Sequence, residues 1–166
     1  MPAASDADSG AGPAAPERPQ LPHTWRPLGP LVLSIGFVVS LAVVSGAAWM
    51  GFDAETQAKF TVFQISTLFF LFLLVCVGFH ALGRSRVTAT AEKLIIVNGW
   101  RRREYAWPQV LGVSMPRGAP WAVFDLADGE SVVGVGIQGS DGARARRAVR
   151  QLRLLIHELG EDDAER

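Results

Sequence analysis

Two long runs without a charged residue lie close together in the first half of this chain. Leu31 to Met50 and Phe60 to Leu82 contain no Asp, Glu, Lys or Arg, and a helix needs about 20 such residues to cross roughly 30 Å of hydrocarbon. A buried core helix is the alternative, but the rest of the 166-residue chain is too small to surround two of them. The first run also lies too far from the N-terminus for an ordinary signal peptide. We therefore predict a transmembrane hairpin over residues 27–83, with spans at about 30–50 and 60–82.

The basic residues near the two runs predict the orientation of this hairpin. The connection 51–59 carries two acids and one Lys but no Arg. Four arginines flank the runs on the other side: Arg18, Arg26, Arg84 and Arg86. Because positive residues close to a span favour the cytoplasm, we predict a multi-pass protein of the cell (inner) membrane with both termini cytoplasmic. Trp25 and Trp49 flank the first run, and we expect both indole rings at the headgroup level.

Composition divides the rest of the chain into two tails and one basic region. Residues 1–26 are rich in Ala and Pro without an apolar period, and we predict a disordered tail. Residues 84–159 hold twelve Lys or Arg against seven Asp or Glu, a net charge of +5, and residues 160–166 form an acidic tail. A basic region beside an anionic leaflet is favourable, at about 1 kcal/mol per cation. The alternative is an ordinary solvated surface.

Short runs typical of β-strands, separated by turn signals, follow the second apolar run. Asn98-Gly99 is a strong hairpin signal because both residues accept positive φ, and Asp128-Gly129 predicts a second tight turn. Six strands are predicted: Val87–Thr90, Leu94–Val97, Arg101–Ala106, Val110–Met115, Trp121–Leu126 and Ser131–Ile137. A helix capped by Asp141 should then run to about Leu159, with apolar residues recurring at intervals of three and four. Residues 84–159 are therefore predicted to form an α+β domain.

The order of these elements, and several of their residues, resemble a known family. The likeness rests on Val87-Thr88, Glu92 to Asn98, Arg101 to Arg103, Trp107 to Val110 with Val113, and the turn Leu126-x-Asp128-Gly129. Arg86 to Leu159 is similar to the bacterial pleckstrin-homology-like (PH-like) domains. It most resembles the actinobacterial group named after low molecular weight protein antigen 6, in which a membrane hairpin precedes the domain. The resemblance implies a partly open β-barrel of two near-orthogonal sheets, capped by the C-terminal amphipathic helix, and a binding platform without enzymatic activity.

Large apolar residues after the strands and along the helix define the expected core. Trp107 and Val110 would enter the mouth of the barrel just after a strand, because Pro108 cannot continue the ladder. The predicted structural core is Trp107, Val110, Leu126, Leu152 and Ile156.

One motif points to a different function. Gly134 to Gly139 matches the dinucleotide fingerprint G-x-G-x-x-G between a predicted strand and a predicted helix. The fingerprint also needs a following parallel strand with an acidic end, and the chain has no room for that second βαβ arm. We expect the glycines to let the last strand bend toward the helix instead. His23, His80 and His157 fall in separate predicted segments, so no catalytic residue, metal site or cofactor is predicted.

A basic strand is the strongest binding candidate. Arg101 and Arg103 should share one face of the strand, with Arg102 on the other, and Lys93 lies in the first interstrand turn. If a face of this strand meets the bilayer, the four residues would contact anionic phospholipid or phosphate. Eukaryotic relatives of the fold bind phosphoinositides mainly through several basic residues of the first interstrand loop. This chain offers only Lys93 there, so non-specific contact is expected. Arginines that protect an exposed edge strand are the alternative.

These observations predict a non-enzymatic integral membrane protein that presents a cytoplasmic PH-like binding module at the inner leaflet. Its expected partners are the lipid bilayer, with weak contact to anionic phospholipid, and an unknown protein or peptide, but no nucleic acid. The alternative is an accessory subunit of a membrane transport or cell-envelope complex, in which the hairpin carries the function. An enzyme would need a buried ionisable pair, and the sequence indicates none.

Overall fold

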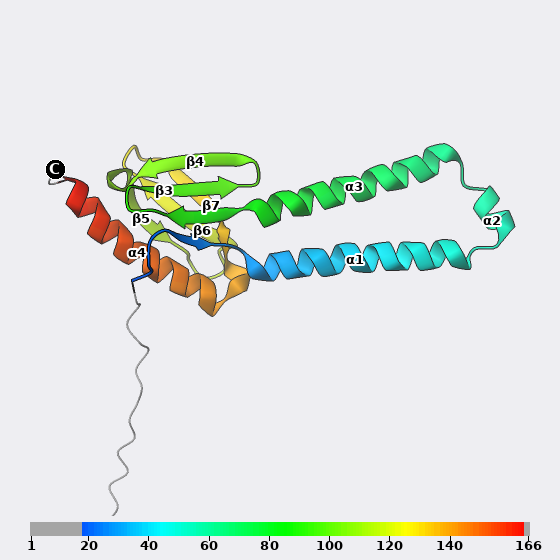
Figure 1. Cartoon of the computed structure of the whole chain (residues 1–166), viewed down its shortest axis with the longest axis horizontal. Coiled ribbons are helices and arrows are strands. Elements are labelled where there is room, and N and C mark those ends of the chain that lie inside the picture. Colours follow the sequence, from blue (N-terminus) through cyan, green and yellow to red (C-terminus); the bar gives the residue numbers. More distant parts are fainter. Residues whose placement is uncertain (1–17, 165–166) are drawn as a thin grey trace, which may run out of the picture.

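A long helical hairpin projects from a β-rich domain in the computed structural model, which describes residues 18–164 (Figure 1). The first elements are β1 (His23–Trp25), α1 (Leu28–Gly51), α2 (Ala54–Ala58) and α3 (Val62–Arg84). The domain continues with β2 (Arg86–Ala89), β3 (Lys93–Asn98), β4 (Arg101–Ala106), the 3-10 turn η1 (Trp107–Gln109) and β5 (Val110–Ser114). It ends with β6 (Trp121–Leu126), β7 (Ser131–Gln138), the 3-10 turn η2 (Gly139–Asp141) and α4 (Ala143–Ala164).

The two long helices of the hairpin expose most of their apolar side chains. α1 has 24 residues and α3 has 23, and both are long and apolar enough to cross a membrane. They pack on each other through contacts such as that of Phe37 with Phe79, whose ring centroids are 5.7 Å apart. A capping box starts α3, because Gln64 N donates to Thr61 Oγ1 and Thr61 N donates to Gln64 Oε1. The hairpin therefore presents an almost entirely apolar outer surface.

A strand that lies before the hairpin belongs to the domain that follows it. β1 pairs antiparallel with β2, with Trp25 opposite Val87, and Thr24 Oγ1 lies 2.9 Å from Thr88 Oγ1. The prediction of a disordered tail over 1–26 is therefore wrong for residues 23–25, whereas residues 1–17 lie outside the described part. Trp25 is only 7% exposed, because its ring packs into the domain core and its Nε1 donates to Gln151 Oε1. The expectation that Trp25 lies at the headgroup level is wrong for the same reason.

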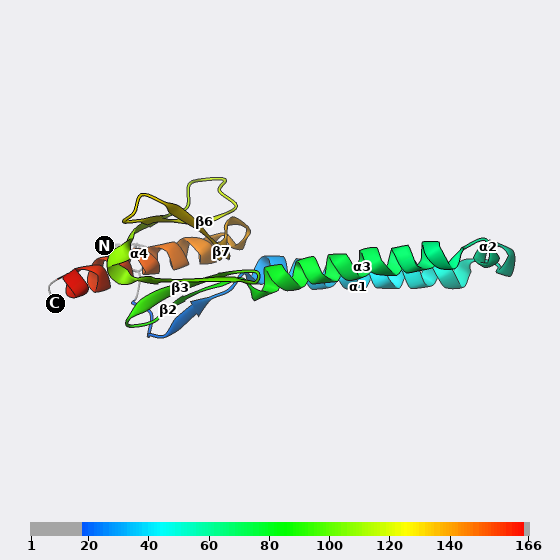
Figure 2. The same cartoon turned by 90° about the horizontal axis from the view of Figure 1, so that it is seen from above.

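The domain consists of two antiparallel sheets and one helix. One sheet has the strand order β1-β2-β3-β4 and the other β5-β6-β7. The sheets remain separate, so the barrel is not closed. Figure 2 shows them on either side of α4, which joins β1 through the Trp25–Gln151 hydrogen bond and β5 through the bond from Arg153 Nε to Val113 O. α4 thus covers the opening between the edge strands β1 and β5, and it extends to Ala164 rather than ending near Leu159.

The core lies between the two sheets and α4. Trp107 is 1% exposed, and its Nε1 donates to Thr90 O at 3.1 Å, so this indole is buried with its one donor satisfied. The other four residues proposed for the core from the sequence are buried as well: Val110, Leu126, Leu152 and Ile156. Phe124 and Leu94 fill the space between the sheets and are fully buried.

The glycines of the dinucleotide-like motif allow β7 to pass very close to β2. A Cβ on Gly136 would lie 2.5 Å from Arg86 Cα, and one on Gly134 would lie 2.6 Å from a ring carbon of Phe124. A Cβ on Gly139 would lie 2.4 Å from Ala119 O. β7 pairs antiparallel with β6, which is not the parallel arrangement that a dinucleotide site requires. The motif therefore serves the packing of the two sheets.

Candidate functional site

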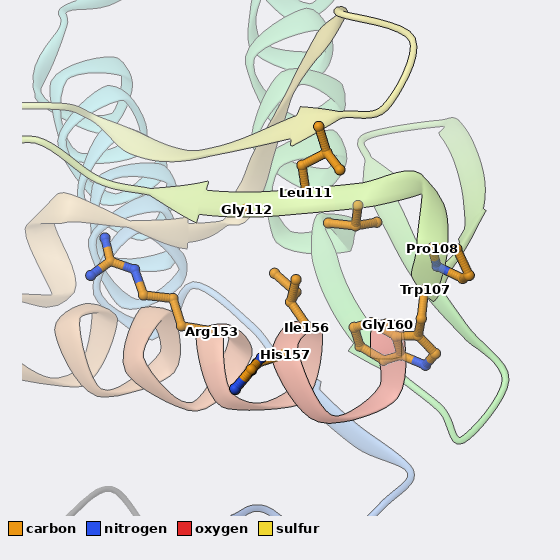
Figure 3. Close-up of a pocket in the computed structure, with 9 residues that line it drawn as sticks. Trp107, Pro108, Leu111, Gly112, Arg153, Ile156, His157 and Gly160 are labelled. Atoms are coloured by element: carbon orange, nitrogen blue, oxygen red, sulfur yellow. The ribbon is translucent and has the colours of Figure 1, made fainter. Parts of the chain in front are cut away.

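A groove runs between α4 and the edge strand β5. It encloses about 340 Å³. Figure 3 shows Arg153, Ile156, His157 and Gly160 of α4 along one wall and Leu111 with Gly112 of β5 along the other. Trp107 and Pro108 of η1, together with Val110, complete the lining. The groove thus combines an apolar floor with basic and ring nitrogen groups on the helical side.

The local structure of β5 explains the shape of this groove. The pairing of β5 with β6 shifts between Val110 and Gly112, so the intervening Leu111 is accommodated as a bulge. Leu111 is 66% exposed, although its neighbour Val110 is only 3% exposed. β5 is also the edge of its sheet, beside α4. A large apolar side chain beside the edge of a sheet offers a contact surface to an extended segment.

The four basic residues proposed as a site do not come together. In the β3–β4 register, Lys93 lies opposite Ala106 and Asn98 lies opposite Arg101, so Lys93 and Arg101 are at opposite ends of this strand pair. Lys93 and Arg102 both form ion pairs with Glu104. These two partners, Lys93 first, hold the pKa of Glu104 below its usual value. Two of the four basic groups are thereby engaged with a carboxylate on an exposed surface.

Arg103 and Arg101 lie on the other face of β4. Arg103 is opposite the buried Ile96, which places it on the core-facing side of the sheet, yet the guanidinium is exposed. Its pKa is raised, chiefly by a hydrogen bond with Tyr105. Arg101 is exposed at the β3–β4 turn. The alternation of faces along β4 therefore places Arg101 and Arg103 on the opposite side of the sheet from Lys93 and Arg102.

Two hydrogen bonds determine which end of the domain faces the hairpin. Gly29 N, at the start of α1, donates to Asp141 Oδ1 at 2.8 Å, so the residue expected to cap α4 binds α1. Gly99 N, in the β3–β4 turn, donates to Ser85 Oγ at 3.0 Å, and Ser85 directly follows α3. The β3–β4 turn and η2 thus contact the ends of the two long helices. Trp100, in that turn, is 63% exposed.

No group of three or more His, Cys, Asp or Glu side chains that could hold a metal ion occurs within residues 18–164. His23 packs against Trp25 with ring centroids 4.6 Å apart, and His157 lines the groove. His80 is in α3, away from both. The histidines therefore remain separate in the fold.

Sequence reasoning missed the groove and the exposed Trp100. Leu111 gave no signal, because an apolar residue in a β-type run is normally counted as core. The only hint was the adjacent Gly112, since an isolated glycine in a strand pattern suggests a bulge. The relation between β5 and α4 has no local signature, because Leu111 and Arg153 are far apart in the chain.

Comparison with known proteins agrees with this fold. The bacterial PH domain family matches residues 84–155. An uncharacterized protein of Mycobacterium bovis is 30% identical over 135 residues, covering 81% of this chain and 85% of the relative. Proteins from two Mycobacterium tuberculosis strains, also uncharacterized, match to the same extent. No solved structure gives a significant match. The family match begins at Arg84, the last residue of α3, so β1 lies outside the matched residues.

Proposed function

The chain belongs to the bacterial PH domain family, and from this we propose that it is a membrane-anchored binding module that holds an extended peptide segment of a protein partner. The observation that supports the proposal most directly is the groove between α4 and β5. It combines an exposed Leu111, the edge of a sheet and the side chains of Arg153 and His157. PH-like domains are typically non-catalytic binding modules.

The chemistry of the groove suggests what such a segment would contain. Leu111 and Ile156 offer apolar surface to one or two apolar side chains. Arg153 lies on the helical wall, with its Nε already bound to Val113 O, and its guanidinium has five N–H groups in total. An acidic residue next to an apolar one would match this wall. The partner segment we propose is therefore extended, apolar and acidic.

We further propose that the hairpin crosses the cell membrane with the domain in the cytoplasm. The apolar outer surface of α1 and α3 supports insertion, since these side chains have no other protein surface to cover them within residues 18–164. The arginines flanking the hairpin, Arg26 and Arg84 among them, favour the cytoplasmic side for both ends. The pairing of β1 with β2 requires both ends on the same side. At the inner leaflet, weak contact with anionic phospholipid would accompany peptide binding.

A photo-crosslinking amino acid at position 111 tests the groove in the full chain in native membranes. We expect a discrete protein adduct that disappears with Arg153→Glu and persists with Arg150→Glu, an exposed residue of the same helix that does not line the groove. The matched control is the same crosslinker at position 133, since Val133 is exposed on β7. Equal adducts at positions 111 and 133, or an adduct insensitive to Arg153→Glu, would contradict the proposal.

The second candidate is an accessory subunit of a membrane complex, in which the hairpin binds other helices. It is favoured by Gly36, Gly46 and Gly78, where an added Cβ would meet nothing within 4 Å. Such open positions let another helix approach closely. Replacing α1 to α3 with an unrelated hairpin of equal length distinguishes the two. Loss of the adduct at position 111 would favour the subunit role, and its retention would favour the groove.

A further inference from the structure

The end of the domain that contacts the hairpin carries exposed aromatic and basic side chains on two loops. The β3–β4 turn is bound to Ser85 through Gly99 N, and a Cβ on Gly99 would lie 3.6 Å from Ala81 Cβ, in the last turns of α3. Trp100 and Arg101 follow directly in that turn. Both side chains are therefore held at the level where α3 leaves the hairpin.

The β5–β6 loop reaches the same end over α1. Gly139 N donates to Pro120 O at 2.9 Å, which joins this loop to η2, and η2 is bound to the start of α1 through Asp141 and Gly29. Arg117 lies in the loop and is exposed, and Trp121 begins β6 and is 39% exposed. We call Trp100, Arg101, Arg117 and Trp121 the Trp/Arg face.

Exposed large apolar side chains are rare elsewhere in the domain. Between residues 85 and 160 they are Trp100, Leu111, Trp121 and Val133. Leu111 belongs to the groove, so two of the remaining three lie on the Trp/Arg face. An indole ring combines an apolar body with a polar N–H, and it favours the headgroup level of a bilayer over either water or hydrocarbon. An ordinary solvated surface does not explain two tryptophans at this level.

Positive charge is concentrated at the hairpin end of the domain, where the two exposed tryptophans also lie. The segments at the hairpin end (25–27, 84–86, 98–101, 115–121 and 139–144) contain six arginines and one acid, Asp141, whose Oδ1 accepts the Gly29 N–H. The turns at the opposite end, 90–93 and 126–131, contain three acids and one Lys. Because the screening length at physiological salt is about 8 Å, only the arginine-rich end would be attracted to a charged leaflet.

We propose that the Trp/Arg face binds the headgroups of anionic phospholipids in the leaflet from which the hairpin emerges. This inference rests on the proposed insertion of the hairpin and replaces the set Lys93, Arg101, Arg102 and Arg103 by a different one that shares only Arg101. The guanidinium groups pair with lipid phosphates, for which their planar fork is well suited. The two indoles enter the headgroup layer beside them. The contact fixes the rotation of the domain about the hairpin and leaves the α4–β5 groove accessible to a protein partner.

An environment-sensitive fluorophore tests this contact in the full chain. The label is placed on Pro116→Cys, an exposed position in the β5–β6 loop, in a Cys76→Ser background that removes the only native cysteine. The protein is incorporated into nanodiscs of phosphatidylcholine alone or mixed with phosphatidylglycerol. We expect a blue shift of emission only in the discs with phosphatidylglycerol, and its loss at high salt. The same label on Ala127→Cys, exposed at the opposite end, should show no shift.

Charge reversal identifies the residues responsible. The double variant Arg101→Glu/Arg117→Glu should abolish the blue shift at position 116, whereas Arg150→Glu, an exposed control on α4, should preserve it. A shift that is equal in both kinds of disc, or that survives the double reversal, would overturn the proposal. Failure of the chain to enter discs at all would overturn the proposed membrane insertion instead. Loaded discs without any shift would overturn the Trp/Arg face while leaving insertion intact.

Discussion

The hairpin and the domain use similar apolar residues in opposite ways. In α1 and α3, side chains such as Val32 and Phe69 are 67% and 71% exposed. In the domain, Leu94 and Phe124 are completely buried. The domain buries its apolar side chains between its two sheets and α4, whereas those of the hairpin need an apolar solvent. β1 joins the two regions, since it precedes the hairpin in the chain but belongs to the domain in space. The domain is therefore attached to the hairpin by two connections rather than one.

The contrast between the hairpin and the domain depends most strongly on the insertion of the hairpin in a membrane, and a topology experiment tests it. A reporter fused after Arg166 should be active in the cytoplasm, and one inserted near Ala54 should not, because arginines flank the cytoplasmic ends of the helices. Activity assays in intact cells measure both fusions. The opposite pattern would place the domain outside the cytoplasm, and activity of both fusions would contradict insertion.

Deleting one aromatic side chain in the domain core and one on the hairpin surface compares how much each region contributes to the stability of the domain. Trp107→Ala should lower the free energy of unfolding of the domain by about 3–5 kcal/mol, as large aromatic deletions in cores do. Trp107 is 1% exposed and donates to Thr90 O, so its removal leaves both a cavity and an unpaired acceptor. The control is Phe69→Ala in α3, which should leave domain unfolding nearly unchanged. Thermal unfolding of the detergent-solubilised full chain, followed by near-ultraviolet circular dichroism, compares the two.

Equal destabilisation by Trp107→Ala and Phe69→Ala would contradict the division into two regions, because it would mean that the hairpin and the domain unfold as one cooperative unit. No change with Trp107→Ala would show that this indole does not anchor the core.

Elements with a local signal were predictable, and those without one were not. The Asn98-Gly99 signal predicted the turn between β3 and β4. Asn98 is however the last residue of β3 and pairs with Arg101, so the turn residues are Gly99, with φ of +62°, and Trp100. The long apolar runs placed α1 and α3. β1 has only three residues, and its partner β2 lies beyond the whole hairpin, so no pattern near His23–Trp25 indicates a strand. A short β-strand next to a Pro-rich segment is not distinguishable from a tail by composition.

The candidate site shows the same limit. Strand alternation placed Arg101 and Arg103 on one face and Arg102 on the other, in agreement with the β3–β4 register. It gave no indication that Lys93 would reach Glu104, because that contact depends on the register between two strands, whereas Arg102 and Glu104 are two residues apart on the same face of β4. The contact of Asp141 with Gly29 links residues on opposite sides of the hairpin in sequence, and only the fold shows it.

Trp25→Ala tests whether β1, which precedes the hairpin in the sequence, contributes to the stability of the domain that follows the hairpin. The indole is 7% exposed and its Nε1 donates to Gln151. Because it lies on an edge strand, we expect the loss of free energy of unfolding to be near the lower limit of the range for core aromatics, about 3 kcal/mol. Thr24→Ala serves as the control, since Thr24 is exposed on the same strand. If Trp25→Ala and Thr24→Ala have the same small effect, β1 does not stabilise the domain.

Gly136→Ala tests the close approach of β7 to β2. The added Cβ would lie 2.5 Å from Arg86 Cα, and backbone atoms must move to relieve the contact. Overpacking of this kind costs about 1–3 kcal/mol. Gly112→Ala is the matched control within a strand, because nothing lies within 4 Å of its added Cβ. We expect a lower melting temperature for Gly136→Ala than for Gly112→Ala. Equal melting temperatures would show that Gly136 is not required for the close packing of β7 on β2.

The smallest effect should come from the ion pairs on the outer face of β4. Lys93 and then Arg102 hold the pKa of Glu104 below its usual value in the folded chain. A carboxyl with a lowered folded-state pKa stabilises the fold above its unfolded-state pKa, and this contribution disappears as the pH falls through the folded-state pKa. Glu104→Gln should therefore lower the melting temperature slightly at neutral pH and match the wild type in acid. Because the group is exposed, added salt should reduce the difference. Glu92→Gln, which removes a carboxylate exposed at the β2–β3 turn and outside the ion pairs that the described residues form, is the matched control. A higher melting temperature of Glu104→Gln than of the wild type at neutral pH would show that charged Glu104 destabilises the fold.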